Sequence, residues 1–157
     1  MKTRIYYLSR LRPSVSTRAE WKGKEERIRN GIAEWILFRH YWQENDSPAA
    51  LARRLDITGD ELALFLKERF EEKYMAMRKR LRIEDAGEIM LEHPEVPIYL
   101  IGKIVGISDK SDFRKLFATE KGCTPSVWKK CKGRSGRIWL SALQDKAQNH
   151  FRSLHKS

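Results

Sequence analysis

One stretch, residues 98–128, limits the fold of this chain more than any other, because it specifies two short helices joined by a tight turn. Ile98, Ile101 and Val105 recur at the spacing that places apolar side chains on one face of a helix. Gly106 follows at once. A chain that leaves a helix often needs a positive φ at this point, which glycine adopts at little cost. The pattern therefore predicts a first helix that ends in a glycine turn.

A second helix is predicted directly after this turn. Ser108 offers a hydroxyl N-cap, and Asp109 would lie in the first turn, near the positive end of the helix dipole. The apolar positions again recur with helical spacing: Phe113, Leu116 and Phe117. Gly122 closes this helix, and Thr124 begins another as its N-cap. A helix, a glycine turn and a capped helix form a helix-turn-helix, whose second helix can enter the major groove of DNA.

The polar face of this second helix carries hydrogen-bond donors where a recognition helix would meet DNA. The donors are Lys110, Ser111, Arg114 and Lys115. A basic helix face is often only a solvated surface. Here the turn and the caps favour the interpretation that the strip reads base edges or contacts nearby phosphates. The N-termini of the helices that begin near Ser108 and Thr124 would offer backbone N–H groups to phosphates.

From Arg82 to Lys130 the sequence resembles the C-terminal DNA-binding half of AraC/XylS-type transcription regulators. The matching positions are Arg82, Ile83, Ala86, Ile98, Ile101, Val105, Gly106, Ser108, Asp109, Ser111, Phe113, Phe117, Gly122, Thr124, Pro125 and Trp128. Three positions depart from the family pattern. Ile107 stands where the family usually has Phe, Gly102 where it has Ala, and Ala118 where a Lys commonly touches the phosphate backbone.

The resemblance implies an all-α fold with two helix-turn-helix subdomains joined by a long linker helix. The periodic patterns extend this division over the whole chain. We expect a basic N-terminal segment (1–20), a first helix-turn-helix subdomain (21–72), the linker helix (73–93), a second helix-turn-helix subdomain (94–131), and a basic linker with a C-terminal amphipathic helix (132–157). The N-terminal segment is either docked on the domain or a mobile basic arm, and the sequence favours neither.

Residues 21 to about 41 have the pattern of a helix with one broad apolar face. That face consists of Ile28, Ile32, Trp35, Ile36, Phe38 and Tyr41, and the opposite side carries Lys22, Glu25, Arg29 and Arg39.

Residues 47–70 resemble the first of the two helix-turn-helix units of the family. Ser47 and Thr58 are expected to cap its two helices. The outward positions of its second helix are Gly59, Asp60, Ala63, Leu64 and Lys67. Lys67 is the one cation among them, so we expect it to contact DNA, whereas Asp60 would repel phosphates. This helix is poorly equipped to read bases. Glu71 replaces the glycine that often follows the helix, which puts that turn in doubt.

The linker helix is expected to end before Pro94 and to hold the two recognition helices ~34 Å apart, one turn of DNA. It would also present a basic flank made up of Arg78, Lys79, Arg80 and Arg82.

The overall charge points to a polyanionic partner. The chain has 32 Lys and Arg against 21 Asp and Glu, a net charge of +11 over 157 residues, so nucleic acid is the expected partner. No apolar run approaches the ~18 residues of a membrane span. Cys123 and Cys131 are not in a metal-binding spacing and are expected to be reduced thiols of a cytoplasmic protein.

No catalytic or metal-binding constellation is found in the sequence, so we expect neither an enzyme nor a cofactor. The leading hypothesis is a sequence-specific regulator of transcription that binds double-stranded DNA. We expect an activator, without an effector-binding domain of its own if the chain is complete. The apolar side chains of Tyr99, Leu100 and Ile104 invite a cover, for which the amphipathic residues 138–154 are favoured and RNA polymerase is the alternative. The alternative is a protein–protein adaptor with weak or non-specific DNA binding, which the acidic stretch 47–72 favours.

Overall fold

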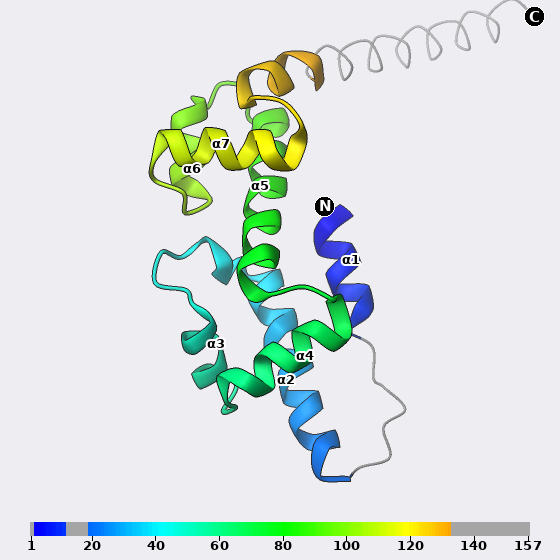
Figure 1. Cartoon of the computed structure of the whole chain (residues 1–157). Helices are drawn as coiled ribbons and strands as arrows, with labels where there is room; N and C mark the ends of the chain where they lie inside the picture. The colour runs from blue at the N-terminus through cyan, green and yellow to red at the C-terminus, as the bar shows by residue number, and fades with distance from the viewer. Residues whose placement is uncertain (1, 12–18, 133–157) are drawn as a thin grey trace, which may run out of the picture.

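The computed structural model describes residues 2–11 and 19–132, with side chains from residue 23 onward in the second stretch (Figure 1). Its helices are α1 (Lys2–Arg10), α2 (Ala19–Leu37), the short 3-10 helix η1 (His40–Trp42), α3 (Pro48–Arg54), α4 (Gly59–Phe70), α5 (Tyr74–Glu92), α6 (Ile98–Ile104) and α7 (Lys110–Lys121). Residues 125–132 are also helical. The predicted all-α class is confirmed, since the described part of the chain contains no β-strand. The predicted C-terminal amphipathic helix lies outside the described residues.

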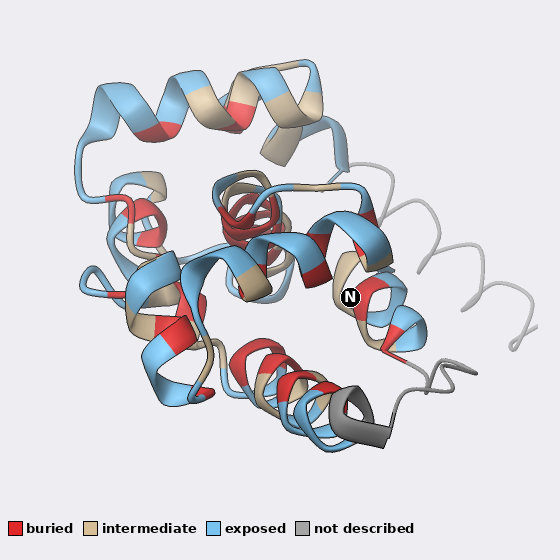
Figure 2. Cartoon of the chain, turned by 60° about the horizontal axis from the view of Figure 1, so that its bottom comes forward, coloured by how far each residue is buried: buried red, intermediate tan, exposed pale blue. Residues whose placement is uncertain are grey.

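Two hydrophobic cores lie along the long helix α5, and Figure 2 shows buried residues on the inward sides of the helices around it. Tyr74, Met77 and Leu81 of α5 belong to the first core, with the apolar side chains of α1 to α4. Ile83, Ala86 and Met90 belong to the second core, with those of α6 and α7. Trp42 packs against both cores. We call α3 with α4 the first helix-turn-helix, and α6 with α7 the second.

The N-terminal segment is docked over the residues described. Tyr7 of α1 is fully buried, and its hydroxyl donates a hydrogen bond of 2.9 Å to Glu72 at the start of the linker helix. Burial, reinforced by the Glu72 carboxylate, raises the pKa of Tyr7 above its ordinary value. Arg4 donates to Glu88 on α5 over 3.2 Å. Of the two alternatives that the sequence left open, the docked one therefore holds for residues 2–11.

The predicted caps of the first helix-turn-helix are confirmed. The Ser47 hydroxyl accepts the N–H of Ala50 at 3.0 Å. Thr58 and Glu61 form a reciprocal capping box, in which each side chain accepts the backbone N–H of the other residue. The turn after α4 forms even without a glycine, because Glu71 itself adopts the left-handed conformation with φ 57°.

The cap of α7 differs from the prediction by one residue. Asp109, and not Ser108, is the N-cap, and its carboxylate accepts the N–H of Asp112 at 2.8 Å. The turn is longer than expected because Ile107 folds back into the core and donates its N–H to the Gly102 carbonyl over 2.8 Å. The helix consequently begins at Lys110. The left-handed glycines on either side of α7 are confirmed at Gly106 and Gly122.

Two side chains in residues 21–41 differ from the prediction in whether they are buried or exposed. Phe38 was assigned to the apolar face but is 72% exposed, because α2 ends at Leu37 and Arg39 adopts a left-handed φ of 53° that shifts the phase. Glu25 was assigned to the outward face but is 4% exposed, because Arg69 of α4 covers it and donates to its carboxylate. A partner 44 residues away leaves no trace in the local pattern.

The predicted basic flank of the linker helix is wrong for two of its four residues. Arg78 and Arg82 are buried and donate hydrogen bonds to backbone carbonyls. Lys79 and Arg80 form ion pairs with Glu120 of α7, and Arg80 pairs with Glu72 as well. Arg78 and Arg82 therefore bind carbonyls in the interior, whereas the exposed Arg80 and the partly exposed Lys79 lie on the predicted flank and are paired with carboxylates.

The two left-handed glycines give a stability test. A Cβ at Gly106 would lie 2.0 Å from the Trp42 carbonyl oxygen, whereas a Cβ at Gly122 would meet nothing within 4 Å. Both positions have positive φ, so alanine costs ~1–2 kcal/mol of backbone strain at each. We expect Gly122→Ala to lower the free energy of unfolding by about that amount, and Gly106→Ala to lower it by at least ~3 kcal/mol, since a clash is added. Urea denaturation measures both, and equal losses would contradict the contact with Trp42.

Candidate nucleic-acid interface

Helix α7 has an exposed strip of polar side chains, and its opposite face is packed into the core. Its four predicted donors, Lys110, Ser111, Arg114 and Lys115, are all exposed. Phe113 and Phe117 on the opposite side are buried. The spacing that buries these two rings is the same spacing that turns the donors outward, so the local sequence alone orients the strip.

Aromatic packing fixes the position of α7. The Phe117 ring lies edge-on to the Trp128 ring at 5.7 Å, and Trp128 lies so close to α5 that a Cβ at Gly87 would approach its ring to 3.0 Å. A Cβ at Gly102 would likewise approach Phe113 to 3.0 Å. The departure from the family pattern at Gly102 thus lets α6 and α7 pack closely. A helix held by such contacts has little freedom to rotate its outer strip.

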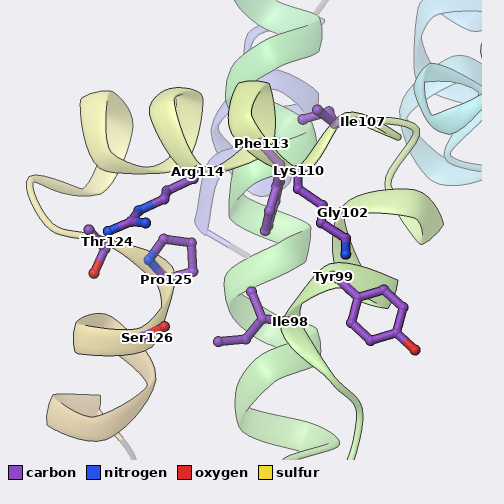
Figure 3. A pocket seen from close by; sticks show the side chains of 10 residues that line it. All are labelled: Ile98, Tyr99, Gly102, Ile107, Lys110, Phe113, Arg114, Thr124, Pro125 and Ser126. Atoms are coloured by element: carbon purple, nitrogen blue, oxygen red, sulfur yellow. The ribbon is translucent and has the colours of Figure 1, made fainter.

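A hollow of about 340 Å³ lies beside the first half of α7 (Figure 3). Lys110 extends from α7 toward Tyr99 of α6, and its ammonium lies 5.1 Å from the centre of the ring. Arg114 extends along the other side toward Thr124. Ser126 also lines the hollow. Two cations and two hydroxyls around an open hollow suit the phosphates and sugars of a nucleic-acid backbone.

The two helix starts differ in what they can offer an anion. Ser108 is exposed but caps nothing, and the Asp109 carboxylate already occupies the N-terminus of α7 with negative charge. Thr124 lies at the start of the last helix, where its hydroxyl is 3.5 Å from the N–H of Val127. Pro125 has no N–H. The Val127 N–H donates to that hydroxyl, so the Ser126 N–H is the group at this start that can face an anion.

The recognition position of the first helix-turn-helix is less basic. Asp60, Ala63, Leu64 and Lys67 are exposed along α4, as predicted. Lys67 lines a mostly apolar hollow of about 540 Å³ together with Leu62, Leu66 and Met75. Helices α4 and α7 lie toward opposite ends of α5 and run in roughly the same direction (Figures 1 and 2). The two helices thus share an orientation but differ in charge.

Sequence reasoning missed two features of this region. The contact of Tyr99 with Lys110 joins residues of different helices, which the spacing within one helix does not predict. The buried pair of Arg78 and Arg82 was placed on the surface. A signal existed for Arg82, since it opens the stretch that resembles the family, but nothing in the sequence tells what it contacts.

Residues 51–130, just over half of the chain, match the family model of a helix-turn-helix domain. The chain belongs to the AraC/XylS-type family. The match runs from within α3 through α4, the linker helix and the whole second helix-turn-helix. As a member of this AraC/XylS-type family, the chain is a DNA-binding transcription regulator. A search of curated proteins found no match.

Solved structures with a similar fold include C-terminal domains of two response regulators. AraT from Geobacillus stearothermophilus is 21% identical with a TM-score of 0.60, over 67% of this chain and 84% of that one. YesN from Fusobacterium nucleatum subsp. nucleatum ATCC 25586 is 23% identical with a TM-score of 0.57, over 68% and 98%. A protein of unknown function from Listeria innocua is 22% identical with a TM-score of 0.57, over 66% and 95%.

The described part of this AraC/XylS-type chain holds no group of three or more His, Cys, Asp or Glu side chains arranged to bind a metal ion. Among the described helices, none combines the length and the apolar character needed to span a bilayer.

The displaced cap of α7 can be tested directly. Asp109→Ala removes the carboxylate that accepts the Asp112 N–H, so we expect it to lower the free energy of unfolding by ~0.5–2 kcal/mol. Ser108→Ala, one residue earlier and exposed, should change it by less than ~0.5 kcal/mol. Thermal and urea unfolding of both variants provide the measurement. A larger loss of unfolding free energy for Ser108→Ala than for Asp109→Ala would show that Ser108 is the N-cap.

Proposed function

We propose that this protein is a sequence-specific regulator that reads double-stranded DNA through α7, and that it acts as an activator. The proposal is carried by one observation, the exposed strip of three cations and a hydroxyl on a helix whose opposite face is locked into the core. In this assignment Arg114 and Ser111 read base edges, because arginine can pair with both guanine acceptors. Lys110 and Lys115 contact bases or the phosphates beside them.

The remaining proposed contacts go to the DNA backbone. Thr124 and the Ser126 N–H fit a phosphate at the start of the last helix. Ser108 would donate its hydroxyl, which no cap engages, to a neighbouring phosphate. Lys67 would contribute a single ionic contact from the first helix-turn-helix. These contacts position the protein and carry no sequence information themselves.

An activator also needs a surface for RNA polymerase. Three apolar side chains of α6 are exposed in the second helix-turn-helix: Tyr99 at 48%, Leu100 at 37% and Ile104 at 42%. Contiguous apolar groups of this kind usually mark a contact surface. The apolar stripe of residues 138–154, which lie outside the described part, is the other cover that the sequence provides.

The second candidate function is a protein–protein adaptor with weak or non-specific DNA binding. It is favoured by the mostly apolar hollow on α4 and by the exposed Leu64 and Met75 near it. Selection of bound duplexes from a random pool, followed by salt titration against competitor DNA, separates the two functions. A specific regulator keeps a preferred site at physiological salt, whereas an adaptor with a generic basic surface loses all binding uniformly.

Arg114 and Lys115 are expected to differ in the kind of loss that they cause. Arg114→Ala should weaken binding to the best site by ~1–3 kcal/mol and relax the base preference at one position. Lys115→Ala, as a phosphate contact, should weaken all sequences alike and lower the salt slope by about one unit. Equal losses on specific and random DNA for Arg114→Ala would remove its reading role. Fluorescence anisotropy over a range of salt concentrations measures these quantities.

The acidic first turn of α4 gives a gain-of-affinity test. Asp60→Asn should modestly strengthen binding to any duplex and leave the preferred site unchanged, because a carboxylate near phosphates is removed. Glu34→Gln, which removes an equal charge from an exposed position on α2, is the matched control. Equal gains from both variants would assign the effect to net charge. Strong base preferences that are abolished by substitutions of Ala63 and Leu64 would contradict the minor role of α4.

A further inference from the structure

Arg82 contacts main-chain groups of both halves of the molecule. Its Nε donates to the Tyr41 carbonyl over 2.5 Å, and its Nη2 donates to the Gln43 carbonyl over 3.1 Å. Both acceptors lie in the segment between α2 and α3. Its Nη1 donates to the Gly106 carbonyl over 3.1 Å, in the turn of the second helix-turn-helix. All three nitrogens of one guanidinium on α5 are therefore used, and two of the bonds go to one half and one to the other.

Close packing surrounds this bridge. The turn at Gly106 lies so near the Trp42 carbonyl that a Cβ there would come within 2.0 Å of it. Arg78, one helical turn earlier, donates to the same Tyr41 and Gln43 carbonyls, over 3.3 and 2.5 Å. Arg82 is 8% exposed. Burial and the nearby Arg78 lower the pKa of Arg82 to about 10, so it remains a cation at neutral pH.

We infer that Arg82 is a positioning residue for DNA binding, which fixes the first helix-turn-helix relative to α7 so that both halves engage one duplex together. This inference rests on the proposed reading of DNA by α7. While α7 holds its site, Lys67 on the first half meets a phosphate only if the two halves keep one relative position. A fixed linkage makes this contact effectively intramolecular, which raises the overall affinity without adding contacts.

Other side chains cannot easily take the place of Arg82. A planar guanidinium spreads five N–H donors in fixed directions and can reach three carbonyls that lie apart. A lysine offers its donors from a single nitrogen, so it can satisfy only part of this set. A methionine fills the volume but leaves the three carbonyls without this donor.

The test compares Arg82→Met with Arg80→Met in the full chain. Arg80 lies on the same helix, and its partners are the Glu72 and Glu120 side chains, so both variants lose one charge but only the first breaks the bridge. We expect Arg82→Met to keep the base preference of α7 and to bind the selected site severalfold more weakly. It should also lose about one unit of salt slope, for the single Lys67 contact. Its footprint should shorten at one end. Arg80→Met should keep the footprint of the original chain.

A second measurement does not depend on DNA. Spin labels at Glu68→Cys on α4 and Thr119→Cys on α7, with Cys123 and Cys131 replaced by serine, report the distance between the two halves. The distance distribution should be narrow in the labelled chain with Arg82 and broad with Arg82→Met. Arg82→Lys should lie between them, and it replaces Arg82→Met if that variant does not fold.

The outcomes separate the inference from the proposed function. If the original chain selects no preferred site, the function proposed for α7 fails, while the distance distributions still decide whether Arg82 holds the halves together. A folded Arg82 variant with an unchanged distance distribution, footprint and salt slope would overturn the positioning role. A purely structural role would lower the melting temperature without changing these three quantities.

Discussion

The relative position of the two helix-turn-helix pairs depends on buried cations that hydrogen-bond to the main chain. Arg78 and Arg82 of α5 saturate carbonyls of the segment between α2 and α3, and Arg82 adds one from the turn before α7. Hydrogen bonds from a charged donor contribute more than those between neutral groups, at ~1.5–3 kcal/mol each. Removing Arg82 takes the donor from the Gly106 carbonyl and leaves the Tyr41 and Gln43 carbonyls with Arg78 alone. The linker helix is therefore an organising element and not only a spacer.

Two buried carboxylates are paired with cations in this interior, Asp46 with Arg78 and Asp85 with Arg4 and Arg39. Asp46 accepts hydrogen bonds from Trp35 and Tyr74 and lies 3.9 Å from Arg78. Asp85, which is 1% exposed, accepts from Tyr41 over 2.5 Å and from Trp42 over 2.8 Å. Burial, reinforced by Asp85, raises the pKa of Tyr41, so this hydroxyl keeps its proton and acts as a donor. Charged groups inside a small fold are stable only when they are paired and hydrogen-bonded in this way.

The two recognition positions share their construction but differ in charge. Both α4 and α7 are capped helices that bury aromatic side chains, such as Phe65 and Phe113. What differs is the outer face, which is basic on α7 and mixed on α4. The packing of each helix constrains only its inner positions, so the outer residues are free to vary with the contact surface that they serve.

The sequence by itself determined the helices and the exposed strip on α7. Apolar spacing, the caps at Ser47 and Thr58, and the glycines at 106 and 122 act between near neighbours, so local rules were sufficient to predict them. The shift of the cap to Asp109 was decided by the burial of Ile107 in the core. Only the tertiary structure decided the burial of Glu25, Arg78 and Arg82, because their partners are distant in sequence. A charged side chain looks the same in a sequence whether it meets water or a carbonyl brought to it by folding.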